Sequence, residues 1–258
     1  MRYIISADDF GYNHTINTAT DEAMVRGWIQ RASLMMNMEG TDEAVSLARE
    51  HGYMDKIAFH LNLTVWYPLT ENVKKTYICN SDGRFRYGVS NYQVNKYCWS
   101  RDVVARIRNE CEAQMKKFRD YGFTSRHIDA HRWIICNIPV FAAIWPLLRK
   151  YGFKTTRTLE GHYFSSIAGE ERKYCKRVFS FIKLKLHTKE NWSGCPSEFF
   201  ESSESGRLKK TARAEVYVHP DMVDGKVVDL FYNYENDKKP IEEIAKRAMR
   251  FGDPIEIK

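Results

Sequence analysis

The sequence predicts an α/β protein built as a (β/α) barrel of the TIM-barrel type. Short apolar segments typical of buried strands alternate with amphipathic segments typical of helices along most of the chain. The confident strands end in side chains able to do chemistry, and in a parallel barrel the carboxyl ends of the strands open on one face. The 258 residues can bury one sizeable core, and we expect a single domain over residues 1–258.

The first strand is predicted at the apolar run Tyr3-Ile4-Ile5, which leads directly into two adjacent carboxylates, Asp8 and Asp9. Adjacent carboxylates repel each other unless a positive group lies beside them. One is therefore a candidate ligand for a hard metal ion and the other a candidate base. The alternative is a plain turn with an Asx cap. Asn13 is then placed to cap a helix that stops at Gly27.

Two further βα units follow. A strand is expected at residues 32–37, a helix at residues 41–51, and a third strand at residues 56–64, which carries His60. Residues 65–100 then break the rhythm, because they are rich in Tyr, Asn, Ser and Gly and lack clear periodicity. Such a long excursion is typical of a segment that passes over a functional site.

The rhythm returns with a helix over residues 101–121, whose apolar positions recur at helical spacing. A fourth strand is predicted at residues 125–131. It contains three polar residues two positions apart, so we expect them to share one face: His127, Asp129 and His131.

The second half of the chain is predicted less completely. A helix over residues 137–150 and a fifth strand over residues 153–159, carrying Arg157, continue the alternation. Residues 160–200 show no clear pattern. A late strand at residues 214–220 contains His219, and a last helix starts at Pro240, ahead of two early glutamates and several late cations.

Composition indicates a folded globular protein, with 43% hydrophobic and 14% aromatic residues. The net charge of +7 is densest over residues 171–187, with a smaller run at residues 209–213. A basic surface can attract acidic glycans, anionic lipid or nucleic acid, or can simply be a solvated face. No nucleic acid is expected as a partner, because the chain carries no recognisable nucleic-acid-binding motif.

Cysteine usage favours a reducing compartment, and we expect a cytoplasmic protein. Cys111 and Cys136 fall in apolar surroundings and are expected in the core, and no C-x-x-C pair occurs. The first strand begins too early to leave room for a signal peptide. The most apolar stretch, residues 133–148, is too short to span a bilayer, so no transmembrane segment is expected. Homo-oligomer formation stays open.

The polar residues at the strand ends form the candidate site. A single histidine on a strand is usually a core residue whose hydrogen bonds are made inside the protein. A His, Asp or Arg at each of five strand ends instead indicates that these side chains form one site. The set suits one metal ion held by a carboxylate and two imidazoles with open positions for water and substrate. It does not suit a structural zinc site, which is closed and usually rich in thiolates. The residues concerned are Asp8, Asp9, His60, His127, Asp129, His131, Arg157 and His219.

Four motifs resemble those of the YdjC-like carbohydrate deacetylase family, which includes chitooligosaccharide deacetylases. They occur in the family's order and, with the first strand, cover residues 4–220. They are Ser6-Ala7-Asp8-Asp9-Phe10-Gly11, Phe59-His60-Leu61-Asn62-Leu63-Thr64, His127-Ile128-Asp129-Ala130-His131 and Val218-His219-Pro220. The resemblance implies a distorted (β/α) barrel, in which we expect seven strands, and metal-dependent removal of acetyl groups from N-acetylated sugars or oligosaccharides.

The resemblance also implies roles for the residues. The metal ligands fall on Asp9, His60 and His131, the base on Asp8 and the acid on His219. Arg157 lies where the family tends to place an arginine, and could hold the base ionised and oriented. Asp129 is expected to orient an imidazole, with His127 deeper in the barrel. One carboxylate and two imidazoles mix hard and borderline ligands; magnesium and zinc are favoured, and cobalt and manganese remain alternatives.

Two departures and two alternatives bear on function. After His131 the chain continues with Arg132-Trp133-Ile134, where the family commonly has further histidines, and residues 160–200 are unusually basic. The alternative functions are another metal-dependent hydrolase, such as a phosphoesterase, and a non-catalytic carbohydrate-binding barrel. An intact Asp8 and His219 disfavour the inert barrel, since a pure binder needs neither a free base nor a free acid.

Two further segments each allow two interpretations. Residues 171–187 are predicted to be a helix with a basic back, either merely solvated or attracting an anionic substrate near the sugar cleft. Its expected buried face is Tyr174, Val178, Phe181 and Ile182. The aromatic residues of 65–100 either stack on sugars or form a satellite core under the loop. They are Trp66, Tyr67, Tyr77, Phe85, Tyr87, Tyr92, Tyr97 and Trp99.

Overall fold

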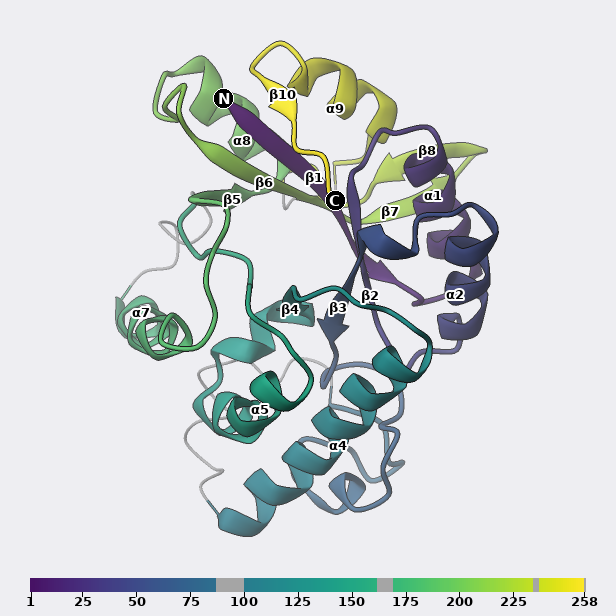
Figure 1. Cartoon of the computed structure of the whole chain (residues 1–258), viewed down its shortest axis with the longest axis vertical. Coiled ribbons are helices and arrows are strands. Elements are labelled where there is room, and N and C mark those ends of the chain that lie inside the picture. Colours follow the sequence, from purple (N-terminus) through teal and green to yellow (C-terminus); the bar gives the residue numbers. More distant parts are fainter. Residues whose placement is uncertain (87–99, 162–168, 234–236, 258) are drawn as a thin grey trace.

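A curled parallel β-sheet forms the centre of the computed structural model, and helices cover its outside (Figure 1). The structure describes residues 1–86, 100–161, 169–233 and 237–257. The strand order is β4-β3-β2-β1-β6-β5, and β10 also pairs with β1. The strands are β1 (Arg2–Phe10), β2 (Arg31–Leu34), β3 (Ile57–Leu61), β4 (Ile128–Ala130), β5 (Trp192–Gly194), β6 (Arg213–Val218) and β10 (Asp253–Pro254).

Helices connect the strands largely as the sequence predicts. Asn13 caps α1 by accepting a hydrogen bond from the Ile16 N–H at 3.0 Å, and Asn137 caps α5 in the same way. The helices are α1 (His14–Val25), α2 (Thr41–Glu50), α4 (Arg101–Asp120), α5 (Ile138–Lys150), α7 (Gly169–Ile182), α8 (Pro196–Glu204) and α9 (Ile241–Ala248). Single 3₁₀ turns occur at η1 (Met54–Lys56), η2 (Val73–Lys75) and η3 (His131–Cys136).

A small antiparallel sheet follows β6 and extends the late strand beyond the predicted boundary. It consists of β7 (Pro220–Val223), β8 (Lys226–Asp229) and β9 (Lys239–Pro240), paired in that order. His219 therefore lies at the junction between the parallel sheet and this hairpin.

No helix in the described part of the chain is both long and apolar enough to cross a membrane.

The predicted distorted (β/α) barrel of seven strands is found in part: the sheet has seven strands with β10 included, but it is curled into a half-barrel that stays open between β4 and β5. Residues 153–159 lie in the gap, but they pair as β-structure only at Thr155, which bridges to His127 on one side and His187 on the other. Further along, the Ser193 side chain donates a hydrogen bond to the Thr158 carbonyl at 2.7 Å. The Thr158 carbonyl is thus satisfied by a side chain and not by the backbone N–H of a neighbouring strand, in keeping with the irregular backbone here.

Helix α7, which corresponds to the predicted basic helix over residues 171–187, packs differently from the prediction. Val178 and Ile182 are buried as expected, but Phe179 shares their face and Phe181 is 56% exposed. At 100° per residue, the stripe centred between Val178 and Phe179 leaves Phe181 outside it. The helix also ends at Ile182, five residues before the predicted limit.

The main hydrophobic core consists of aliphatic and aromatic side chains, and the two predicted core thiols, Cys111 and Cys136, are buried in it. Phe118 of α4 lies at its centre. Its ring centroid is 4.7 Å from that of Phe123 in a stacked arrangement and 5.4 Å from that of Phe59 on β3. Packing of this kind holds α4 against the strand that carries His60.

Phe118→Ala should therefore lower the free energy of unfolding by about 3–5 kcal/mol, since it removes a large buried side chain and leaves a cavity. Val25→Ala on α1 is the control, because Val25 is 58% exposed and should change stability by less than about 0.5 kcal/mol. Urea denaturation followed by circular dichroism measures both. Equal midpoints for the two variants would contradict this account of the core.

Candidate active site

A bulge at the end of β1 brings two neighbouring carboxylates to one place. In a regular strand Asp8 and Asp9 would point to opposite faces. Here the register of β1 against β2 shifts over residues 7–10, and Asp9 has a positive φ of 64°. Both carboxylates consequently lie close to His60. Bulges and strained backbone of this kind are common beside functional sites.

Asp9, His60 and His131 meet as the sequence predicts. The Oδ1 atom of Asp9 lies 2.8 Å from Nδ1 of His131 and 3.2 Å from Nε2 of His60. Burial by itself would raise the pKa of Asp9, but the two imidazoles outweigh it and hold that pKa well below its ordinary value. The chain thus presents one ionised oxygen between two ring nitrogens.

This trio fits a divalent metal ion. One oxygen and two nitrogen donors lie within 4.8 Å of one another. His60 is 1% exposed, and although its Nε2 lies 3.2 Å from Oδ1 of Asp9, the two atoms do not have the geometry of a hydrogen bond. A buried ring nitrogen without a partner is costly unless something else binds it. The donor set and the orphaned nitrogen both suit a metal with open positions.

Asp129 contacts the ring nitrogen of His60 that faces away from Asp9. Its Oδ1 lies 2.6 Å from Nδ1 of His60, and its Oδ2 accepts a hydrogen bond from Ser33 Oγ at 2.8 Å. Burial lowers the pKa of His60, but Asp129 outweighs it and raises that pKa to about 10. A carboxylate on one ring nitrogen fixes the ring and leaves the other nitrogen facing Asp9, which is the usual arrangement behind a metal-binding histidine.

Arg157 forms an ion pair with the second carboxylate, Asp8. Its Nη1 and Nη2 lie 2.7 and 2.6 Å from Oδ2 and Oδ1 of Asp8, a bidentate pair. The same Nη2 lies 3.0 Å from Oδ2 of Asp129. Arg157 does not end a regular strand as predicted, but the irregular segment still delivers it to the site.

Behind Arg157 lies a second ion pair that sequence reasoning missed. Glu215, in the middle of β6, accepts a hydrogen bond from Arg157 Nε at 2.8 Å and lies 2.5 Å from Nη2 of Arg31. Burial by itself would raise the pKa of Glu215, but the two guanidinium groups lower it to about 2. The available signal was a charged residue inside an apolar strand, between Ala214 and Val216.

His219 directly follows Val218 of β6, which pairs with Ala7 of β1, the residue before Asp8. Its backbone N–H donates to Oδ1 of Asp229 at 2.7 Å, and its ring packs edge-on against Phe231. Asp229 was also missed, although it ends the short apolar run Val227-Val228. Burial raises the pKa of Asp229 to about 6.

His127 is not part of the trio, but one of its ring nitrogens lies within 4.8 Å of carboxylate oxygens of Asp129 and Glu215. The strand β4 covers only Ile128–Ala130, and His131 begins η3, where the next two residues have left-handed φ values of 54° and 57°. His127 lies deeper as expected, with Nδ1 3.2 Å from Thr155 Oγ1. Burial lowers its pKa to about 3 and keeps it neutral.

The aromatic residues of the long excursion divide between two environments. Phe85 is buried in the core and Tyr77 packs against it. Trp66 is half-buried on a small cluster with Met35 and Met38, while Tyr67 is exposed. Tyr87, Tyr92, Tyr97 and Trp99 lie outside the described residues.

Asp229 predicts a pH dependence of stability. Its pKa of about 6 is above the ordinary 3.8, so the folded protein binds this proton more tightly than the unfolded chain does. Protonated Asp229 therefore stabilises the folded state; this stabilisation is complete below about pH 4 and is lost as pH rises through about 6. Asp229→Asn keeps an oxygen acceptor for the His219 N–H and removes the buried charge. Between pH 4 and pH 7 the variant should gain on the order of 2–3 kcal/mol relative to the parent.

Denaturant titrations at several pH values measure this difference. Asp55→Asn, at an exposed position, is the control and should track the parent at every pH. A constant difference between Asp229→Asn and the parent over this range would show that Asp229 does not titrate there.

Comparison with known proteins finds relatives named for one activity. The chain is 34% identical to a carbohydrate deacetylase from Clostridium beijerinckii over 70% of this chain and 68% of that protein. It is 32% identical to a carbohydrate deacetylase from Brevibacillus brevis over 58% of this chain, and it spans 57% of the length of that relative.

A solved structure shares the fold. It is a protein from Enterococcus faecalis named for cellobiose-phosphate cleavage, 19% identical, with a TM-score of 0.70 and coverage of 99% of this chain and 97% of that one. The family model described as YdjC-like protein matches residues 2–249. The chain therefore belongs to the YdjC-like protein family.

Proposed function

We propose that this protein is a metal-dependent carbohydrate deacetylase, a hydrolase that removes acetyl groups from N-acetylated sugars. The observation that carries the proposal is the different environment of two adjacent carboxylates. Asp9 lies between two imidazoles, whereas Asp8 is bound by Arg157. Two relatives named carbohydrate deacetylase support the reaction class.

Asp9, His60 and His131 are the residues that would hold the metal ion. When bound, a divalent ion polarises the amide carbonyl and lowers the pKa of water. The donor set of one carboxylate and two imidazoles does not by itself choose the metal. We expect magnesium or zinc, with cobalt and manganese as the alternatives.

Asp8 is proposed as the general base. Arg157 keeps it oriented through two hydrogen bonds, yet each carboxylate oxygen has a second lone pair left for a water proton. His219 is proposed as the acid that protonates the amine nitrogen as the C–N bond breaks. Water adds to the carbonyl carbon, and the products are acetate and the free amine.

Acetate release tests the proposal. The purified protein would be incubated with N-acetylglucosamine, its disaccharide and longer N-acetylated oligomers, each with magnesium, zinc, cobalt or manganese. We expect acetate from at least one sugar, and loss of activity in excess chelator. Phosphate release from p-nitrophenyl phosphate in the same preparations, without acetate from any sugar, would favour a phosphoesterase instead.

The metal site makes a prediction about binding. His60→Ala and His131→Ala should each weaken metal affinity by roughly ten- to a hundredfold or more, because each removes a donor. His187→Ala is the control, since His187 is exposed and lies outside the trio. Elemental analysis after dialysis against limiting metal measures the stoichiometry. Unchanged metal in both site variants would place the ion elsewhere.

The two carboxylates are predicted to separate in function. Asp8→Asn should retain the metal but lower kcat on the order of 10²-fold or more, since it removes the base. Asp9→Asn should weaken metal binding as well as turnover. Metal content and acetate release are measured on the same samples. Equal metal loss in both variants would show that Asp8 and Asp9 act together as ligands.

A further inference from the structure

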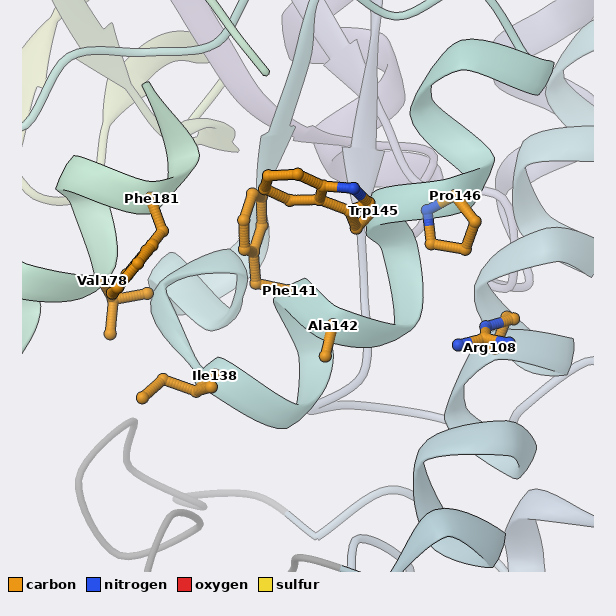
Figure 2. A pocket seen from close by; sticks show the side chains of 8 residues that line it. All are labelled: Arg108, Ile138, Phe141, Ala142, Trp145, Pro146, Val178 and Phe181. Atoms are coloured by element: carbon orange, nitrogen blue, oxygen red, sulfur yellow. The ribbon is translucent and has the colours of Figure 1, made fainter. Parts of the chain in front are cut away.

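A surface groove lies away from the candidate active site, between α5 and α7. It has a volume of about 520 Å³, and one end reaches Arg108 of α4. Figure 2 shows Phe181 and Val178 of α7 on one side, with the rings of Phe141 and Trp145 of α5 across from them. Among the described residues, the groove lining is almost entirely apolar, with Arg108 as the one charged residue.

Two large side chains protrude beside this groove. Phe181 is 56% exposed, and Leu184, just after the end of α7, is 69% exposed. The Leu184 N–H donates a hydrogen bond to the Phe181 carbonyl at 3.1 Å, so the two residues belong to one turn. Exposed single hydrophobic residues are normal, but Phe181 also lines the groove and so extends its apolar surface, here called the apolar patch.

Cations surround the apolar patch. Arg177 is exposed one helical turn before Phe181, and Lys185 follows Leu184, with its Nζ 4.7 Å from the centroid of the Trp145 ring. Lys176 is also exposed. Among the side chains that the structure describes, which leave out residues 162–172 and 175, no carboxylate lies within 4.0 Å of the cationic atoms of these three residues, while neighbouring Lys183 lies 3.9 Å from Glu160. Positive charge and protruding apolar groups therefore occupy the same surface.

We propose that this surface, formed by α7, residues 183–185 and the exposed side of α5, docks the protein onto an anionic phospholipid bilayer. The apolar side chains would enter the headgroup region, while the cations lie against lipid phosphates. Charge complementarity selects this occupant. A second copy of the chain in a symmetric contact would bring the same cations face to face, which opposes association. This activity is separate from deacetylation.

Vesicle co-sedimentation tests the proposal with two matched pairs of variants. Phe181→Ser/Leu184→Ser removes the protruding groups, and Val25→Ser/Met249→Ser is its control, at positions 58% and 62% exposed. Arg177→Gln/Lys185→Gln removes two cations from the patch, and Lys209→Gln/Lys210→Gln removes two exposed cations elsewhere. Vesicles of phosphatidylcholine alone are compared with vesicles that also contain phosphatidylglycerol.

The parent should bind the vesicles with phosphatidylglycerol and not those of phosphatidylcholine alone, and high salt should weaken binding. Both patch variants should lower the bound fraction at least about fivefold, and both controls should match the parent. Thermal melting confirms that each variant is folded. No binding of the parent to anionic vesicles overturns the proposal. So does equal binding of the Phe181→Ser/Leu184→Ser variant, or a Phe181-dependent dimer in light scattering without vesicle binding.

Discussion

The candidate active site depends on one buried cation, Arg157. A buried guanidinium is tolerated only when carboxylates surround it, because its desolvation is costly. Arg157 contacts Asp8 of β1, Asp129 of β4 and Glu215 of β6. These strands are not all neighbours, and Arg157 itself lies in the irregular segment that occupies the gap between the edges of the sheet. Ion pairs therefore hold this segment where a regular strand ladder is missing.

The same contacts give two adjacent acids different chemistry. Without the bulge, Asp8 and Asp9 would face opposite sides of β1, and only one could join the site. With it, both reach the region of His60, where Asp8 takes a guanidinium partner and Asp9 takes imidazole partners. Both carboxylates have nitrogen partners, but only Asp9 lies between two ring nitrogens that can serve as ligands. This difference underlies the roles proposed for them.

Much of the fold was predictable because its signals are local. Asn13 and Asn137 cap helices that begin where the sequence places them, and the helix over residues 101–121 shows its apolar periodicity directly. The metal-ligand candidates were predictable because parallel strands bring their carboxyl ends together. The irregular backbone of residues 153–159 was not predictable, since it depends on side-chain hydrogen bonds such as the one that Ser193 donates to the Thr158 carbonyl. Glu215 and Arg31 become partners only when the pairing of β1, β2 and β6 is known.

The most direct measurement is a crystal structure of the protein soaked in zinc or manganese, with the ion located by anomalous scattering. Three groups of side chains in the described part of the chain could bind an ion, so position discriminates between them. We expect one ion bound by Asp9, His60 and His131, with Asp8 still paired to Arg157. An ion held instead by Asp8, His60 and Asp129, or by His127, Asp129 and Glu215, would contradict it.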